Sequence, residues 1–217
     1  MRILFFVLAV FAGTAYPIQA CTTALLLAID VSQSIDVAEY RIQTEGMAEA
    51  LMDPEVADAI VAGEVALTVV QWSGQSDQEV SIPWTQIRTH VDLQEFADKA
   101  RNMRRAFVMS STGVGALMRF AHEQFETAPQ CLRRVIDISG DGNDNAGTSP
   151  EQARRDAEAA GIMINALAIE GMGRAITKFY EQSVITQRGF VMTSRGHSGY
   201  AETLKRKIRR EVAQALF

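Results

Sequence analysis

The chain has 217 residues, of which 47% are apolar and 22% are charged. This length fits one well-packed domain or two very small ones, and the composition argues against a disordered chain, collagen-like repeats and a coiled coil. The formal net charge of -5 gives no reason to expect a nucleic-acid partner.

The first twenty residues have the order of a secretory signal. Arg2 precedes the apolar stretch 3–12, and small residues and a proline follow up to Ala20. The apolar stretch is about half the roughly 20 residues that a membrane-spanning helix needs. We therefore expect a signal peptide over 1–20 and an exported domain over 21–217, which is periplasmic or extracellular and has no stable membrane insertion.

The next segments predict strands that alternate with helices. Residues 22–29 form an unbroken apolar run that ends in Asp30, which is typical of a buried parallel strand. Asp36 and Glu39 predict a capping box at the start of a helix that runs to about Leu51. A short turn is expected at Asp53-Pro54, strands are expected over 64–72 and 79–84, and Pro83 places the second of these at a sheet edge.

The rest of the chain continues this alternation. Helices are expected over 96–103 after a capping box of Asp92 and Glu95, over 114–125, between Ser149 and Gly161, over 177–184 and over 200–216. Strands are expected over 134–139, 162–169 and 190–192. This order predicts a doubly wound α/β domain with a mostly parallel sheet and helices on both faces.

Three oxygen-rich loops follow or adjoin these elements. The first is Asp30-Val31-Ser32-Gln33-Ser34, the second carries Thr112, and the third begins at Asp141-Gly142. In a doubly wound sheet, ligands bind beyond the carboxyl ends of the strands. Carboxylates and hydroxyls without a nearby Cys or His suit Mg²⁺ or Mn²⁺ better than zinc. Singly, each loop could be a helix cap or a turn, but three at one edge are harder to explain as caps.

These motifs resemble a known family. Asp-x-Ser-x-Ser from Asp30, Thr-x-Val-Gly-x-Leu from Thr112 and the apolar strand that ends at Asp141-Gly142 resemble the metal-ion-dependent adhesion site of the von Willebrand factor type A domain, over about residues 21–217. The segments 72–74, 82–85 and 134–142 resemble an exported bacterial branch of that superfamily with no assigned function. The resemblance implies a six-stranded sheet of order 3-2-1-4-5-6 with the third strand antiparallel.

The resemblance also implies a site and a function. Ser32, Ser34 and Thr112 would supply hydroxyl ligands to one Mg²⁺ or Mn²⁺, and Asp30 and Asp141 would bind it directly or through water. Neutral hydroxyls leave a dication only partly neutralised, so it can accept an acidic side chain of a protein partner. We therefore expect an exported adhesion-type binding module that is not an enzyme and is monomeric when unbound. Ser110-Ser111 stands where many relatives have glycine, so the path of the second loop is open.

Two alternatives remain at this stage. Residues 140–144 resemble the metal loop of a Mg-dependent phosphatase of haloacid-dehalogenase type, and Asp30 resembles its nucleophile. Such enzymes have a second carboxylate two residues on, where this chain has Ser32, and their glycine-aspartate loop is one residue longer. The other alternative is a structural domain whose metal loops have lapsed.

The two cysteines, Cys21 and Cys131, precede Asp30 by nine residues and Asp141 by ten. Both are therefore expected at the amino ends of the first and fourth strands, which the resemblance makes neighbours. In an exported protein such a pair favours a disulfide. The alternative is a lipid on Cys21, because the residues before it loosely resemble a lipoprotein processing site.

The last helix carries the one basic cluster. We expect its charged side chains to form a solvated face, and its apolar ones to face the core. The expected basic residues are Lys205, Arg206, Lys207, Arg209 and Arg210, and the expected core residues are Leu204, Ile208, Val212 and Ala215.

Overall fold

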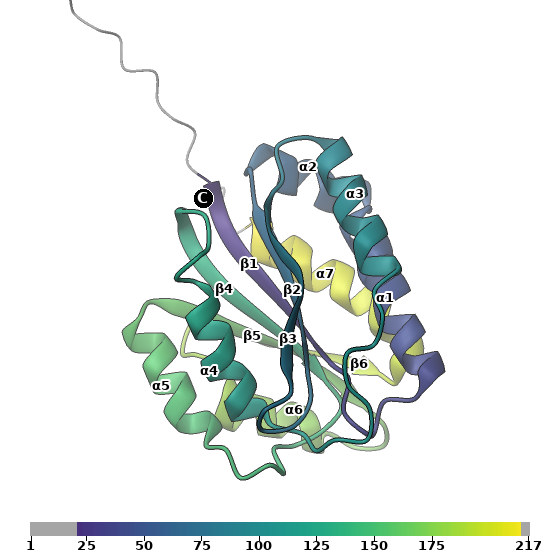
Figure 1. Ribbon diagram of the computed structural model, residues 1–217, viewed down its shortest axis with the longest axis vertical. Helices are drawn as coiled ribbons and strands as arrows, with labels where there is room; N and C mark the ends of the chain where they lie inside the picture. The colour runs from purple at the N-terminus through teal and green to yellow at the C-terminus, as the bar shows by residue number, and fades with distance from the viewer. Residues whose placement is uncertain (1–20, 214–217) are drawn as a thin grey trace, which may run out of the picture.

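The computed structural model describes residues 21–213 (Figure 1). The expected signal peptide, and the end of the expected last helix with Ala215, lie outside the described residues. The strands are β1 (Cys21–Asp30), β2 (Ala66–Trp72), β3 (Gln78–Gln86), β4 (Cys131–Gly140), β5 (Ile162–Glu170) and β6 (Val191–Arg195). The α-helices are α1 (Val37–Leu51), α2 (Pro54–Ala62), α3 (His90–Arg101), α4 (Val114–Gln124), α5 (Pro150–Ala159), α6 (Ala175–Phe179) and α7 (Tyr200–Ala213).

The six strands form one sheet in the order β3-β2-β1-β4-β5-β6. Every neighbouring pair is parallel except β2 and β3, which are antiparallel. Helices α1, α2, α3 and α7 cover one face of the sheet, and α4, α5 and α6 cover the other (Figure 1). The predicted doubly wound architecture, strand order and antiparallel β3 at an edge are confirmed.

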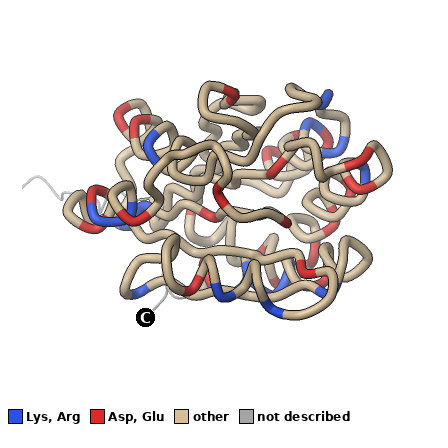
Figure 2. Tube along the Cα trace, turned by 90° about the horizontal axis from the view of Figure 1, so that it is seen from below, with Lys and Arg blue, Asp and Glu red and all other residues tan. Residues whose placement is uncertain are grey.

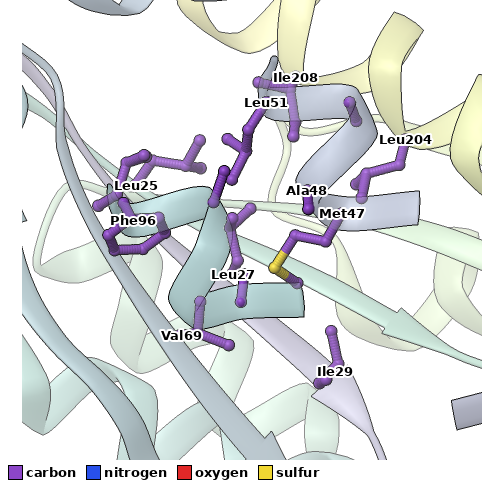
Figure 3. Close-up of a cluster of buried hydrophobic side chains, with 14 of the residues drawn as sticks. Leu25, Leu27, Ile29, Met47, Ala48, Leu51, Val69, Phe96, Leu204 and Ile208 are labelled. Atoms are coloured by element: carbon purple, nitrogen blue, oxygen red, sulfur yellow. The ribbon is translucent and has the colours of Figure 1, made fainter. Parts of the chain in front are cut away.

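The central strand β1 is buried on both faces, which explains its unbroken apolar run. Because side chains alternate across a strand, successive residues enter different cores. Leu25, Leu27 and Ile29 pack toward α1 and α7, together with Met47, Leu204 and Ile208 (Figure 3). Ala24, Leu26 and Ala28 lie in the cluster under α4 and α5.

Three local predictions differ from the structure. Helix α3 begins at His90 rather than near residue 96, because Thr89 caps it and forms the capping box with Asp92. Asp92 is therefore the third helical residue and not the cap. Segment 54–62 is a full helix rather than a short turn. Helix α6 ends at Phe179 and continues as a π-helical turn, η1 (Tyr180–Val184).

The predicted disulfide joins Cys21 to Cys131. The two residues face each other in the parallel register of β1 and β4, with Cα atoms 4.5 Å apart. Because the Cys21 sulfur is bonded to Cys131, it cannot also carry a lipid, and the structure favours the disulfide. It closes a loop with a sequence separation of 110 residues. By restricting the unfolded chain, such a bridge contributes about 3 to 5 kcal/mol.

The prediction that Lys207 lies on a solvated face is wrong. Its side chain is fully buried, and its Nζ lies 2.5 Å from Asp137 Oδ1 in β4 and 2.7 Å from Glu211 Oε1. Asn165 Nδ2 in β5 also donates to Glu211 Oε1. Burial raises the pKa of Glu211 to about 7, and Asp137 acts in the same direction, whereas Lys207 opposes the shift.

The apolar prediction for the same helix is confirmed for its described part, since Leu204, Ile208 and Val212 are buried. Lys207 lies three residues after Leu204 and therefore on the same side of α7. It faces the sheet because its acidic partner, Asp137, comes from the middle of β4.

Candidate metal centre

The first loop leaves β1 at Asp30, which is buried at the carboxyl end of that strand. Ser32 N donates to Asp30 Oδ1 at 2.8 Å, which folds the loop back over the carboxylate. Arg105 Nη2 donates to the carbonyl oxygens of Val31 and Ser32, each at 2.8 Å. The guanidinium of Arg105 thus braces the backbone of the loop.

The second oxygen of Asp30 has an unusual environment. Asp30 Oδ2 is buried and has no hydrogen-bond partner among residues 21–213. Burial raises the pKa of Asp30 to about 7, hydrogen bonds from Ser32 partly offset this, and the charge of Asp141 adds to it. No lysine or arginine of the described chain forms an ion pair with Asp30. A buried carboxylate with a free oxygen fits a bound cation, which would compensate its charge.

Hydroxyl groups connect this loop to the third loop. Ser32 Oγ lies 3.2 Å from Ser34 Oγ, and Ser34 Oγ donates to Asp141 Oδ1 at 2.6 Å. Asp36, not Ser34, caps helix α1. The hydroxyl of Ser34 therefore serves the contact between the two loops, and the structure brings Asp30, Ser32, Ser34 and Asp141 together.

The second loop lies against both of the others. Gln33 N donates to Ser110 O at 3.0 Å, and Thr112 exchanges backbone contacts with Asn145: Thr112 N donates to Asn145 Oδ1 at 2.8 Å, and Asn145 N donates to Thr112 O at 2.9 Å. A Cβ on Gly142 would lie 3.3 Å from Thr112 Oγ1. Thr112 therefore lies beside the loop of Asp141.

Thr112 is not the cap residue of helix α4. The cap position of α4 is Gly113, and the first-turn N–H groups of Gly115 and Ala116 donate to Asp144 Oδ1 and Thr148 Oγ1 rather than to Thr112. Thr112 is nevertheless buried. Its hydroxyl has no role in the helix start, which leaves it available as a ligand.

Beneath the site, Gly140 gives room to three side chains. A Cβ at Gly140 would lie 2.5 Å from the Tyr180 hydroxyl oxygen, 3.0 Å from Asp30 Oδ2 and 3.2 Å from Trp72 Cζ2. The Tyr180 hydroxyl and Trp72 Nε1 are buried and, within residues 21–213, have no hydrogen-bond partner. Burial and then the charges of Asp30 and Asp141 raise the pKa of Tyr180 well above its usual value.

Sequence reasoning missed Arg105, Asn145, Gly140 and Tyr180. Arg105 and Asn145 act on backbone groups of distant loops, and such contacts leave no periodic pattern. A glycine between an apolar strand and an aspartate was the available signal for Gly140, because it permits close approach.

The residue types at this edge are mostly neutral donors of oxygen. Within residues 21–213, no three His, Cys, Asp or Glu side chains gather as a metal-binding group. A set of two carboxylates and three hydroxyls differs from such a group. Figure 2 views the molecule from below and shows acidic segments in the middle of the trace, with basic segments mainly in its outer parts.

Comparisons with solved structures identify the fold. Proximal thread matrix protein 1 from the mussel byssus is 19% identical, with a TM-score of 0.66 over 89% of this chain and 48% of the other. Another structure of that mussel protein, 15% identical with a TM-score of 0.61 over 89% and 46% of the two chains, has a zinc-occupied MIDAS motif. This chain thus spans about half the length of the mussel protein.

The vWF domain of Mfa5, a type V pili tip protein from Porphyromonas gingivalis, is 10% identical with a TM-score of 0.60, over 90% of this chain and 97% of the other. A search of curated proteins finds no match. The family model described as "Protein of unknown function (DUF1194)" matches residues 20–216. The chain therefore belongs to the DUF1194 family and has the fold of a von Willebrand factor type A domain.

Proposed function

We propose that this chain is an exported protein-binding module that holds one divalent cation at the carboxyl edge of its sheet and uses it to bind an acidic side chain of a partner. The observation that carries the proposal is Asp30 Oδ2, a buried carboxylate oxygen without a partner among the described residues. It belongs to the loop in which Ser32 Oγ contacts Ser34 Oγ, and Ser34 Oγ in turn donates to Asp141 Oδ1.

The proposed ligands are Asp30, Ser32, Ser34, Thr112 and Asp141, directly or through water. When bound, the cation would supply a positive centre for an anionic oxygen. Two carboxylates and three neutral hydroxyls leave it able to accept a further carboxylate. Hard oxygen ligands favour Mg²⁺ or Mn²⁺. The zinc in the MIDAS motif of the mussel protein supports a divalent cation in this fold.

Export is supported by one feature of the structure. The Cys21–Cys131 disulfide is typical of oxidising compartments. Over the described part of the chain, no helix has the length and apolar character needed to cross a membrane. The pilus-tip protein with the same fold also supports an adhesion-type role.

Binding is favoured over hydrolysis by the residue at position 32. A phosphatase of the resembled type has a carboxylate there to protonate the leaving group, whereas Ser32 has a hydroxyl that contacts Ser34. We therefore propose a binding module rather than an enzyme.

Calorimetry with Mn²⁺ and Mg²⁺ tests the site. Wild type should bind one ion, and Asp30→Ala should abolish binding because it removes the buried carboxylate. Thr112→Ala should weaken binding on the order of tenfold to a hundredfold, since it removes a neutral ligand. Asp58→Ala changes an exposed acid and should leave binding unaltered.

Results of two kinds would contradict the proposal, in metal binding and in hydrolysis. One is metal binding by Asp30→Ala that equals wild type, or no binding by wild type, which would favour a lapsed site. The other is turnover of phosphate esters by wild type with Mg²⁺ that Asp30→Ala abolishes, because that would make the site hydrolytic.

A further inference from the structure

The edge that carries the proposed cation site also exposes large apolar side chains. Val37, Val108 and Met109 are 76%, 65% and 77% exposed, and Met172 is fully exposed. They come from three segments: the start of α1, the loop before α4, and the loop between β5 and α6. Exposed apolar side chains that gather at one edge from separate segments are typical of an interaction surface.

Chain position, strand register and one backbone contact place three of these residues near the loops of the proposed ligands. Val37 follows Ser34 by three residues. Met109 directly precedes Ser110, whose carbonyl oxygen accepts from Gln33 N in the first loop. Met172 follows the end of β5, which pairs with β4 up to the Gly140 position, next to Asp141.

The backbone of Met109 supplies a second observation. Its φ is +61°, in the left-handed region that costs a non-glycine residue energy. The side chain gains little from packing in return, because it is largely exposed. A strained residue that does not serve the core of its own chain is typical of a functional surface.

The charges nearby favour an apolar rather than an anionic surround. Arg105 is the cation attached to the first loop, and it donates to two backbone carbonyl oxygens. Arg174, two residues after Met172, forms an ion pair with Glu181. A lipid surface would be recognised by unpaired Lys and Arg around the apolar residues, whereas Arg105 is engaged by the loop backbone and Arg174 by Glu181.

We infer that Val37, Val108, Met109 and Met172 form an apolar rim that contacts apolar side chains on either side of the partner's acidic residue. The occupant is a protein segment in which Asp or Glu is flanked by residues such as Leu or Phe. This inference rests on the proposed function: once the cation holds the carboxylate, the flanking residues lie over the rim. Burial of apolar surface there would strengthen and select the contact.

A displayed library of heptapeptides with a central Asp and random flanks tests this, with the immobilised protein in Mn²⁺. Wild type should enrich peptides with apolar flanks. The variant Val108→Ser/Met109→Ser/Met172→Ser should bind the enriched peptide at least about tenfold more weakly, because it loses apolar contact area. Its Mn²⁺ affinity by calorimetry should match wild type, which separates the rim from the ligands and reports a folded site.

A matched control lies at the opposite edge of the sheet. Leu132 and Val91 are 74% and 66% exposed, at the starts of β4 and α3. The variant Leu132→Ser/Val91→Ser loses comparable exposed apolar groups and should bind the peptide as wild type does. Met109→Gly removes the side chain while relieving the backbone, so it should weaken peptide binding without lowering stability.

The outcomes distinguish the two proposals. Selection of Asp peptides with polar flanks, or equal peptide binding by wild type and the triple variant, overturns the rim and leaves the cation site standing. Selected peptides that bind equally well in chelator, or after Asp→Ala replacement in the peptide, overturn the proposed function. A Mn²⁺-dependent dimer in sedimentation that the triple variant loses would assign the rim to a second copy and overturn the peptide occupant.

Discussion

Two buried carboxylates on neighbouring strands of the same sheet differ in whether a cationic side chain lies beside them. Asp137, in the middle of β4, has Lys207 Nζ at 2.5 Å, and that ammonium also contacts Glu211. Asp30, at the end of β1, has no cationic partner within residues 21–213. Its Oδ2 lacks a hydrogen bond there, and so do both oxygens of Asp137 apart from the ion pair with Lys207, so the counter-ion is what distinguishes the two carboxylates. Both side chains are almost completely removed from solvent.

The difference shows which buried carboxylate the chain neutralises with a cation of its own and which it does not. Burying a charge is costly unless it is paired, so a carboxylate with an internal counter-ion belongs to the architecture. A carboxylate without one, at the ligand-binding edge of a doubly wound sheet, is open to a partner from outside. We therefore interpret the Asp137 cluster as structural and the Asp30 cluster as functional.

The largest expected effect comes from removing the internal counter-ion. Lys207→Met leaves Asp137 and Glu211 buried without their ammonium, and should lower the free energy of unfolding by about 3 to 5 kcal/mol. Denaturant titration measures this. Lys205→Met is the matched control on the same helix, because Lys205 pairs with Glu202 at the surface, and it should cost far less stability than Lys207→Met. Equal losses in the two variants would contradict the structural interpretation of the cluster.

The second effect depends on metal. At a Mn²⁺ concentration of about 100 times Kd, wild type should gain about 2.7 kcal/mol over its stability in chelator. Asp30→Asn keeps the shape of the side chain but should gain nothing from Mn²⁺, while remaining at least as stable as wild type in chelator. Asp137→Asn should be destabilised in both buffers, because it deprives Lys207 of its partner. Thermal unfolding in both buffers is the measurement, and a metal-dependent gain retained by Asp30→Asn would refute the assignment.

The third effect depends on pH. Glu211 has a folded pKa of about 7 against an ordinary value of 4.5, so the folded state binds the extra proton between these values. The contribution of Glu211 to stability is therefore complete below pH 4.5 and is lost as pH rises to 7, with a slope of at most about 1.4 kcal/mol per pH unit.

Glu211→Gln should remove that component of the slope, because the amide does not titrate. Asp137, Lys207 and the half-buried Arg133, whose Nη1 donates to Glu211 O, are the charged groups that face Glu211, and all remain in the variant. Unfolding free energies measured from pH 4 to 8 decide the point. An identical pH profile in both proteins would show that Glu211 is not the titrating group.

The comparison also shows what the sequence could reveal. Apolar runs at β1 and β4 predicted buried strands, and acidic or hydroxyl residues directly after them predicted loops that meet at one edge. The contact of Ser34 with Asp141 confirms that this pair of loops meets. The full strand order, and the placement of Cys21 and Cys131 on neighbouring strands, depended on the family resemblance, because local patterns do not define which strands are neighbours.

Polar pairs between residues far apart in the chain could not be predicted from the sequence. Lys207 stands in a row of basic residues on α7, and its burial depends on Asp137, which lies 70 positions earlier in the chain. Helical periodicity weighs each side chain by its own polarity and therefore places Lys207 in solvent. In the same way, the Thr89 cap of α3 competed with an equally regular Asp92 and Glu95 pattern, and only the observed hydrogen bonds distinguish them.

The smallest expected effect concerns the hydroxyl beneath the site. The Tyr180 hydroxyl is buried with no described partner, so Tyr180→Phe should leave stability in chelator unchanged or raise it by up to about 1 kcal/mol. Tyr40→Phe removes a hydroxyl that donates to Met103 O at 3.2 Å and should cost about 1 kcal/mol. Denaturant titration of both variants compares them. A greater loss for Tyr180→Phe would mean that its hydroxyl pairs with Asp30, and that Asp30 is already satisfied without a cation.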